Sequence, residues 1–572
     1  MLSGRTRSLI LGALAADLAV LVYLNALRNP FVYDDLLGVV RHATLMEAGG
    51  VLALVRDNLF RPVVSLSFAV DHVLWDLQPR GFHFTSPLLH ALNTALLFVL
   101  ARRAAADWRD RVPAAAPDDL GADVVAAVAA GLFAVHPLLS EAVGYVSGRG
   151  DVLAATFVLL ALLALRTGVR RPRALALGLG LMIVGALTKE VAVVVPVVAL
   201  AADRLLLDGD AAARRRRFLA WHLPIIGVAG ALGLARAASF FWIERSLTSG
   251  AAWPNLQAQV SIVWRYVALL LAPIGQSIVH FVPPAATPVD PRAVAAALAL
   301  LAVGVLTWRF RRRQPLIAFG VVWFLTFLAP AAAVALYEPM AERRLYLASA
   351  GFFLVVAALA AGLWTRAGRP ARVAGVTAFV VVLAVLGALT LARNLVWHDA
   401  ETLWRDAAVK APRAWRSHAG LANALGELGR CDEALPEFET ALRLSPQPEV
   451  YTNYGICLAA ARRVPEAARA FTRALDLDPG QAMAHHNLGL LALHAGDLEG
   501  AHAHFLRAVS MNPHNAWWRQ TLMRIYELEI RDPAKTLELC RAIVRVAGRE
   551  TPGAMACLER YELGAADTPP RS

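Results

Sequence analysis

The sequence predicts an all-α membrane protein, in which a polytopic helix bundle of about eleven spans precedes a C-terminal helical solenoid. Two observations carry this prediction. The mean hydropathy of the 572 residues is +0.51, which soluble domains rarely reach, and long apolar runs recur up to about residue 396. Beyond that point the apolar density falls, and a repeat of 33 or 34 residues begins.

The apolar runs define the predicted membrane domain, residues 1–396. They lie at residues 8–27, 84–101, 123–140, 151–167, 174–189, 190–206, 218–240, 292–308, 315–336, 347–364 and 373–395. Several are shorter than the ~20 residues that cross a bilayer, so their limits are loose. The first run follows Arg5 and Arg7 and is longer than the apolar core of about 7–15 residues that signal peptides carry. We therefore expect it to be retained as a span.

The net charge of +12 comes from short basic clusters between the apolar runs, at residues 166–173, 214–217, 309–313 and 365–372. This pattern indicates membrane topology and no nucleic-acid partner. The stretch at 260–275 decides the orientation, since a crossing there would place cluster 309–313 outside. We take it as re-entrant or interfacial. The N-terminus is then cytoplasmic, and everything after residue 396 is extracytoplasmic.

This topology places four segments on the outer face, namely residues 28–83, 137–150, the turn at Lys189 and the loop 337–346. Within the first of them, the apolar stretch 61–75 is too short to span and is interrupted by charge, which is typical of a helix lying in the interface.

The C-terminal region carries a tetratricopeptide (TPR) pattern. Its columns are Pro412, Pro446, Pro479 and Pro513; Ala407, Ala441, Ala474 and Ala508; Trp404, Phe438, Phe471 and Phe505; Ala400, Ala434, Ala467 and Ala501. Small residues at fixed positions let paired helices cross closely, and proline ends each second helix. The predicted domain, 397–550, comprises a half repeat at 397–412, repeats at about 415–446, 448–479 and 482–513, and a degenerate cap at 514–549. A tail follows at 551–572, and the last span is expected to supply the first helix of the half repeat.

Several chemistries lack their signatures. Cys431, Cys457, Cys540 and Cys557 show no CxxC spacing, so neither a metal site nor a disulfide framework is argued for. The chain has no Walker loop and no HExxH motif, and no cofactor is expected. A divalent cation is an option that these residues do not indicate.

Ionisable residues converge on the predicted outer face. They are Asp34, Asp35, Arg61, His136, Glu141, Arg149, Lys189, Glu190, Glu342, Arg343 and Arg344. Singly, each is explained as a charge snorkelling to the interface. Together they suit another task, because Arg and Lys hold phosphate and a carboxylate takes the proton of an attacking hydroxyl. A lipid-linked sugar donor carries its phosphate at this depth.

The ordered motifs "FVYDD", "RPVVSLSF", "FHFTSPLLHALN", "FAVHPLLSEAV", "GRGDVLAATF", "TKEVAVVVP" and "AERRLYLASAGF", followed by TPRs, resemble the transmembrane and TPR-containing O-mannosyltransferases. The wider group is the GT-C glycosyltransferases that use polyprenyl-phosphate sugars. The resemblance implies a GT-C-like bundle whose first outer loop carries the catalytic acidic motif and whose other outer loops bind the donor phosphate. The family's usual members are eukaryotic with longer repeat arrays, so the short array and the Ala/Arg-rich composition here suggest a bacterial relative.

The resemblance assigns roles to individual residues. Asp34 and Asp35 match the acidic motif, and Arg343 matches the arginine of the "AER-x-LY" motif. The expected donor phosphate ligands are Arg343, Arg344, Lys189, Arg149 and Arg61. Further site candidates without an assigned role are His136, Glu141, Glu190 and Glu342.

We expect an integral membrane glycosyltransferase of a bacterial inner membrane. It would move a sugar, with mannose as the family's example, from a polyprenyl-phosphate carrier to an extracytoplasmic acceptor such as protein Ser/Thr hydroxyls. Inversion or retention is left open. One alternative is a ligase using a lipid-pyrophosphate-linked glycan. The other is a non-enzymatic TPR scaffold, which would need one or two spans and no charges gathered on one face.

Two pairs of residues carry specific expectations. Asp34 and Asp35 repel each other, so at least one pKa should be raised. By resemblance Asp34 is the base and Asp35 an orienting partner or a ligand of the acceptor. The structural alternative is that the pair only caps the N-terminus of an interfacial helix. Asn453 and Asn487 occupy the same position in successive repeats, and their amides could hold an acceptor peptide backbone. The alternative is that both asparagines are solvated polar residues without a binding role.

Overall fold

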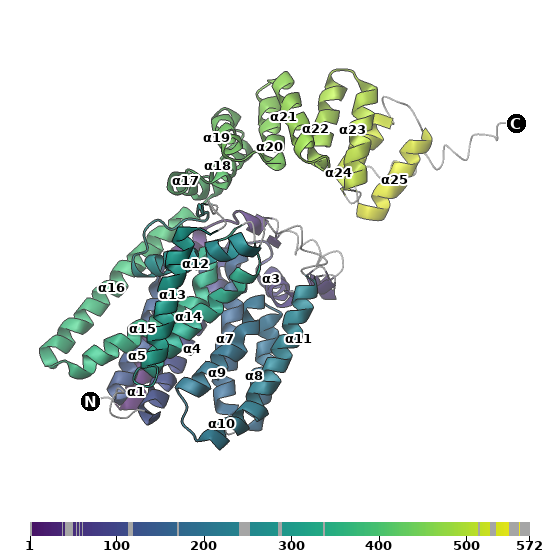
Figure 1. The fold of residues 1–572 in the computed structure, drawn as a ribbon. Helices are drawn as coiled ribbons and strands as arrows, with labels where there is room; N and C mark the ends of the chain where they lie inside the picture. Colours follow the sequence, from purple (N-terminus) through teal and green to yellow (C-terminus); the bar gives the residue numbers. More distant parts are fainter. Residues whose placement is uncertain are drawn as a thin grey trace. The chain divides into compact units, whose positions relative to one another are not determined.

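The computed structural model describes residues 3–36, 38–39, 50–52, 54–56, 58–59, 61–111, 118–168, 171–239, 252–283, 289–335, 338–512, 515–526, 533–547 and 560. The described residues form helices and turns, without a strand among them (Figure 1). The chain divides into two compact units, Met1–Asp406 and Ala407–Ser572. The expected tail 551–572 lies, apart from residue 560, outside the described residues.

Long helices build the first unit. They are α1 (Gly4–Leu21), α4 (Pro79–Arg111), α5 (Asp119–Val135), α7 (Arg149–Gly168), α8 (Pro172–Ala186), α9 (Val195–Leu205), α11 (Leu223–Ser239), α12 (Ala252–Leu271), α13 (Pro291–Phe310), α14 (Pro315–Ala333), α15 (Leu345–Arg366) and α16 (Arg369–Val396). Short elements join them: η1 (Leu24–Arg28), α3 (Pro62–Trp75), η2 (Pro137–Leu139), α6 (Ser140–Val143), η3 (Val146–Gly148), η4 (Glu190–Val194), α10 (Ala211–Arg217), η5 (Phe218–His222) and η8 (Glu342–Arg344).

Close helix packing forms the core of this unit around α4, α5, α7, α14 and α15. The crossing of α14 and α15 depends on two glycines. A Cβ atom on Gly351 would lie 2.5 Å from the carbonyl oxygen of Gly320, and one on Gly320 would lie 2.5 Å from the carbonyl oxygen of Gly351. Without a hydrophobic drive between helices in lipid, such close backbone approach is a main source of association.

Eight described helices are long and apolar enough to cross a membrane, or nine if the pair Asp119–Val135 and Pro137–Val143, bent by 56°, is one span. The sequence predicts about eleven spans, which is two more than the larger of these counts of long apolar helices. The difference lies at residues 174–206, where α8 has 15 residues and α9 has 11. The turn at Lys189 and the 3-10 helix η4 separate α8 from α9, which begins at Val195 with Pro196 in its first turn.

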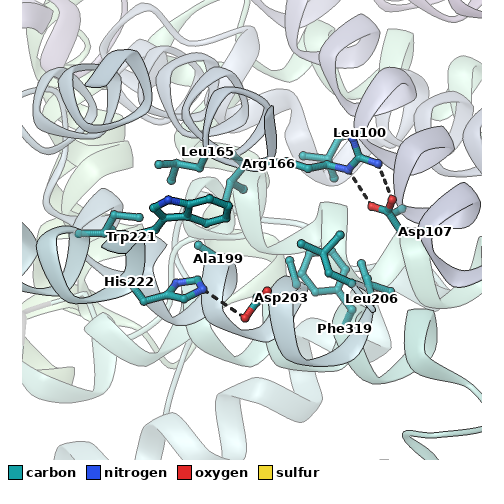
Figure 2. Close-up of a pocket in the computed structure, with 15 residues that line it drawn as sticks. Leu100, Asp107, Leu165, Arg166, Ala199, Asp203, Leu206, Trp221, His222 and Phe319 are labelled. Atoms are coloured by element: carbon teal, nitrogen blue, oxygen red, sulfur yellow. Dashed lines mark hydrogen bonds and ion pairs between the residues drawn. The ribbon is translucent and has the colours of Figure 1, made fainter. Parts of the chain in front are cut away.

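One end of the bundle carries the basic clusters, and its buried charges are paired. Asp123 accepts hydrogen bonds from Arg7 Nε (2.6 Å) and Arg102 Nε (2.8 Å), which ties α1, α4 and α5 together. A cavity of about 70 Å³ lies at this end. The ion pair of Asp107 with Arg166 stands beside it (Figure 2). Pairing of this kind removes much of the cost of holding charge at membrane depth. We call this region the basic end and the opposite one the outer end.

Helix α12, which contains most of the undecided stretch 260–275, lies along the outer end. Near its start, Asn255 Nδ2 donates to the carbonyl oxygen of Ala332 (3.0 Å), at the last turn of α14. Near its other end, His136 Nε2 lies 3.1 Å from the carbonyl oxygen of Leu270. Both contacts are with outer-end segments, although a 20-residue helix is about 30 Å long. This placement supports the interfacial interpretation, and α12 is not among the candidate spans.

The second unit consists of helix pairs. They are α18 (Trp415–Glu427) with α19 (Cys431–Leu444), α20 (Pro448–Ala460) with α21 (Val464–Leu477), α22 (Ala482–His494) with α23 (Leu498–Met511), and α24 (Ala516–Ile525) with α25 (Pro533–Ala547). Helix α17 (Ala400–Lys410) crosses the division between the units. The columns of the sequence pattern form the packed seams: a Cβ atom on Gly455 would lie 2.6 Å from the Phe471 ring, and one on Gly489 would lie 3.0 Å from the Phe505 ring.

A disulfide joins Cys431 and Cys457, with their Cα atoms 5.1 Å apart. This corrects the expectation that the cysteines argue for no disulfide. The two residues stand 26 positions apart, and that spacing is not a known motif. They meet because Cys431 begins α19 and Cys457 lies near the end of α20, and consecutive TPR helices run antiparallel.

Candidate functional site

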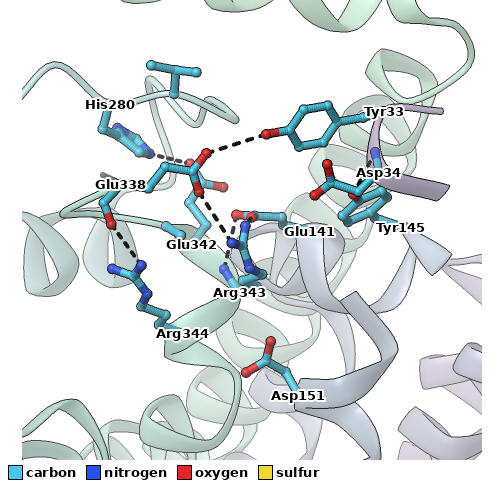
Figure 3. Close-up of polar contacts among 12 residues, drawn as sticks. Tyr33, Asp34, Glu141, Tyr145, Asp151, His280, Glu338, Glu342, Arg343 and Arg344 are labelled. Atoms are coloured by element: carbon cyan, nitrogen blue, oxygen red, sulfur yellow. Dashed lines mark hydrogen bonds and ion pairs between the residues drawn. The ribbon is translucent and has the colours of Figure 1, made fainter. Parts of the chain in front are cut away.

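A polar cluster occupies the outer end of the first unit (Figure 3). It is built from segments that are far apart in the sequence: the segment after η1, which is helical at residues 34–36 and carries Asp34, the helix α6 with Glu141, and η8 with Arg343. A chain of contacts connects them. Tyr33 Oη lies 3.5 Å from Glu338 Oε1, and Glu338 is ion-paired with Arg343 Nη2 at 3.3 Å. The structure therefore gathers the acidic motif and the "AERR" motif into one site.

Asp34 and Asp35 occupy different environments. Asp35 is 0% exposed, and its carboxylate accepts hydrogen bonds from the backbone N–H (2.7 Å) and the hydroxyl (2.6 Å) of Ser147. Burial raises the pKa of Asp35 to about 7, with the charge of Asp34 as a smaller contribution in the same direction. Asp34 is exposed, and its backbone N–H donates to Tyr145 Oη at 3.2 Å. The pair thus separates into a buried carboxyl group and a solvent-facing one.

Aromatic side chains hold the turn at Tyr33, which leads into the helical residues 34–36. Tyr33 has a φ angle of 56°, which is uncommon for a residue with a side chain. Its ring stacks on Tyr145 (6.2 Å between centroids) and meets the edge of Trp404 (5.3 Å), and Tyr145 in turn stacks on Trp397 (5.0 Å). Surrounding structure must over-determine such a backbone, and strain of this kind is common at functional sites.

Arg343 is held between two carboxylates. Its Nη1 donates to Oε1 of Glu141, and its backbone N–H donates to Glu141 Oε2 at 3.0 Å. The second partner, Glu338, is more accessible: its side chain is 23% exposed, against 2% for Glu141. The Arg343 side chain is 26% exposed, so it faces the site from a partly buried position.

Three of the other expected phosphate ligands each bind a different protein partner in the structure. Arg344 donates to the carbonyl oxygens of Glu338 (2.7 Å) and Pro339 (2.8 Å), which fixes the loop before η8. Lys189 Nζ lies 2.5 Å from Asp151 Oδ2, and Arg61 Nη2 lies 3.0 Å from both carboxylate oxygens of Glu190. These three basic residues remain at the outer end, near the cluster.

Arg149 is fully buried. Its guanidinium is 2.6 Å from Asp71 Oδ2, donates to the carbonyl oxygen of Phe82 (2.7 Å) and lies over the Phe68 ring at 4.8 Å. A buried arginine with a carboxylate partner ties α3, α4 and α7 together. The geometry therefore assigns Arg149 to the scaffold beneath the site.

Two further candidates also support the scaffold. His136 ends α5, and its Nδ1 accepts the backbone N–H of Leu138 at 3.3 Å. Glu342 accepts the backbone N–H of Ser277 at 2.7 Å and lies 2.9 Å from His280 Nε2. Glu342 thus anchors the segment after α12 to η8.

The asparagines of the second unit are half-buried and make hydrogen bonds. Asn453 Nδ2 donates to Asn423 Oδ1 at 3.0 Å, which links α18 to α20. Asn487 Nδ2 donates to the carbonyl oxygen of Met483 at 2.8 Å, one turn earlier in α22. The two positions are equivalent in the repeat, but their present partners differ.

Sequence reasoning missed several residues of the outer-end cluster. Glu338 stood within the expected outer loop 337–346 but was not singled out, and Tyr33 stood beside the acidic pair. Asp151 stood within the quoted motif "GRGDVLAATF" but was not singled out, and Tyr145 and Asp71 stood in none of the quoted motifs. The one available signal was the general rule that a buried arginine or lysine needs a buried carboxylate partner. Within the described residues, no group of three or more His, Cys, Asp or Glu side chains is placed to hold a metal ion.

Comparisons with known proteins found a repeat family that matches the C-terminal region and relatives that match most of the chain. A tetratricopeptide repeat family model matches residues 386–448, 419–482 and 455–516. A protein O-mannosyl-transferase of Drosophila melanogaster is 26% identical over 542 residues, covering 75% of this chain and 60% of the relative. One of Homo sapiens is 26% identical over 508 residues, covering 76% of this chain and 55% of the relative. The chain spans less than two thirds of the length of these relatives.

Solved structures add little to this likeness. The crystal structure of MamA is 18% identical and covers 29% of this chain and 90% of its own, with a TM-score of 0.22. A score this low carries no argument about the fold. The chain is an all-helical membrane bundle with C-terminal TPR repeats, and it resembles the TPR-containing protein O-mannosyl-transferases.

Proposed function

We propose that this chain is an integral membrane glycosyltransferase that moves a sugar from a polyprenyl-phosphate carrier to protein Ser/Thr hydroxyls, with mannose as the first candidate. The names of the relatives support the class of reaction. The observation that carries the proposal within this chain is the exposed carboxylate of Asp34 beside a partly exposed, charged Arg343. A base and an anion ligand at one membrane face are what transfer from a lipid phosphate requires.

In this proposal Asp34 acts as the base. Its carboxylate takes the proton of the acceptor hydroxyl while that oxygen bonds to the anomeric carbon, and the bond from that carbon to the carrier phosphate breaks. The leaving group is the polyprenyl phosphate, which departs with the added negative charge. Asp35 positions the segment that carries Asp34 through Ser147 and does not reach the substrate, because it is fully buried.

Arg343 receives the leaving phosphate. Its partner Glu141 is buried and remains bound, whereas Glu338 is more exposed and makes the longer contact of 3.3 Å. The donor phosphate would replace Glu338 on the guanidinium, since a phosphate oxygen matches the same geometry. Lys189, Arg61 and Arg344 supply positive potential around the position of the phosphate.

The active face is proposed to be extracytoplasmic, in a bacterial inner membrane. The basic clusters lie at the end opposite to Asp34, and positive residues mark the cytoplasmic side. The disulfide between Cys431 and Cys457 adds an independent argument for the TPR unit, because structural disulfides persist in oxidising compartments.

The TPR unit is proposed to hold the acceptor protein. Asn453 and Asn487 stand at equivalent positions of successive repeats and carry amides that can pair with both N–H and C=O groups of an extended peptide. Their present bonds, to Asn423 and to the backbone of Met483, would be exchanged for bonds to the acceptor.

Mass spectrometry of envelope glycoproteins tests the proposal in cells. Cells with the wild-type chain should carry hexose-modified Ser/Thr peptides that disappear on deletion and on Asp34→Asn substitution. Asp76→Asn is the matched control, since Asp76 is an outer-end carboxylate with an 82% exposed side chain outside the cluster. An unchanged set of glycopeptides after deletion would refute the proposal, and loss in the Asp76 variant as well would show a general defect.

A further inference from the structure

A second site lies at the basic end, in a groove of about 800 Å³ between α1 and α4. Both helices are candidate spans, so the groove opens toward the hydrocarbon of the bilayer. Its lining is apolar along most of its length and basic at one end. The residues that matter for its chemistry are Arg5, Gly12, Ala13, Ala95, Phe98 and Arg103.

The depth of the groove fits one leaflet. Its α1 residues run from Gly4 to Ala16, and a helix rises about 1.5 Å per residue, so the groove is about 18 Å long. That is roughly half of the ~30 Å hydrocarbon thickness. Small side chains keep it open: Gly12 sits against Phe98, where a Cβ atom would already lie 3.3 Å from the ring.

The basic rim carries charge that the described residues do not compensate. Arg102 is paired with Asp123, and Asp119, the one acidic residue in the lining, is paired with Arg109. Arg5 and Arg103, by contrast, make no hydrogen bond or ion pair within the described part of the chain. Two cations therefore stand at the headgroup end of an apolar groove.

We propose that this groove binds an anionic phospholipid of the bilayer. Its phosphate would lie between Arg5 and Arg103, and one acyl chain would lie along Gly12, Ala13 and Ala95. Basic pockets between membrane helices at the cytoplasmic side are typical sites for anionic headgroups. The occupant is a bilayer lipid and not the sugar donor, since the groove lies at the end opposite to Asp34 and Arg343.

A lipid bound in this groove would help to hold α1 against the bundle. Only 28% of the apolar window of this helix is buried in the bundle, so its own contacts hold it weakly. The same helix leads through η1 directly to the segment that carries Asp34. An acyl chain packed between α1 and α4 would add to the packing contacts that hold α1.

Native mass spectrometry of the detergent-purified full chain tests this site, with phosphatidylglycerol and phosphatidylcholine as probes. We expect the wild type to retain phosphatidylglycerol preferentially. The double variant Arg5→Gln/Arg103→Gln should weaken that binding about 10- to 30-fold, from the loss of two headgroup contacts. The variant Ala13→Phe fills the groove without changing charge and should weaken binding as well.

The control is Arg312→Gln/Arg313→Gln, which removes two exposed charges from the same end outside the groove and should leave binding unchanged. Equal loss in both double variants would reduce the site to general charge attraction and overturn the proposal. Full binding in Ala13→Phe would do the same, because the groove would then be irrelevant. Tighter binding of polyprenyl phosphate than of phosphatidylglycerol would reassign the groove to the donor.

Discussion

At the scale of single residues, burial separates groups that are neighbours in sequence. Asp34 and Asp35 are adjacent, yet one is exposed and the other fully buried with Ser147 as its partner. Arg343 and Arg344 are both half-buried and differ in their partners, since the first binds carboxylates and the second binds backbone carbonyls. These differences set the role that each side chain can take.

Asp35 should make stability depend on pH. Its pKa is about 7 in the folded chain and about 4 when unfolded, so its ionisation costs stability as the pH rises from about 4 to 7. Asp35→Asn cannot ionise and escapes this cost. We expect the melting temperature of the variant minus that of the wild type to increase between pH 5 and pH 8, measured by thermal unfolding in detergent. A difference that stays constant with pH would contradict the burial argument.

Arg343 should act on the donor. Arg343→Ala is expected to raise the apparent KM for the polyprenyl-phosphate sugar and to slow transfer, because the phosphate loses its guanidinium partner. Arg343→Lys should restore only part of this, since an ammonium cannot bind two oxygens in a fork. Initial rates at varied donor concentration decide the matter, with Arg80→Ala as an exposed outer-end control. Wild-type donor KM in Arg343→Ala would remove this residue from the site.

At the scale of helices, the periodicity of the sequence predicts where helices lie better than it predicts what they contact. The spacing of Ala441, Ala474 and Ala508 located the TPR helix pairs, because small residues at fixed intervals have one structural explanation. Apolar composition alone did not show that the helices of two predicted spans, α8 and α9, are only 15 and 11 residues long. The domain limit expected at residues 396/397 stays a prediction, and the compact units divide at Asp406 and Ala407.

The disulfide gives a prediction for α19 and α20. In the variant Cys540→Ser/Cys557→Ser only Cys431 and Cys457 remain of the four cysteines. Its unfolded chain should react with no maleimide before reduction and with two after it, counted by mass. Reduction should also destabilise the TPR unit by about 3 kcal/mol, as expected for a loop of this length. Two reactive thiols in unreduced protein would argue against an oxidising compartment.

At the scale of the whole first unit, charge sorts the ends of the bundle. Arg166 and Arg217 of the basic clusters pair with Asp107 and Asp203 at one end, where Arg102 also pairs with Asp123. Asp34 and Arg343 belong to the polar cluster at the other end (Figure 3). The sequence predicted which charged residues would share the outer end, because the spans alternate in direction. It could not predict which carboxylate would pair with which cation, since pairs such as Arg149 with Asp71 depend on helix packing.

The most direct test of the account is sugar transfer by the purified full chain in proteoliposomes. Polyprenyl-phosphate mannose with a labelled sugar is the donor, and a Ser/Thr peptide is the acceptor. We predict labelled peptide with the wild type, and a rate lower by at least about 100-fold with Asp34→Asn, as expected when a general base is lost. Asp76→Asn should keep the wild-type rate. Near-wild-type transfer by Asp34→Asn would contradict the account.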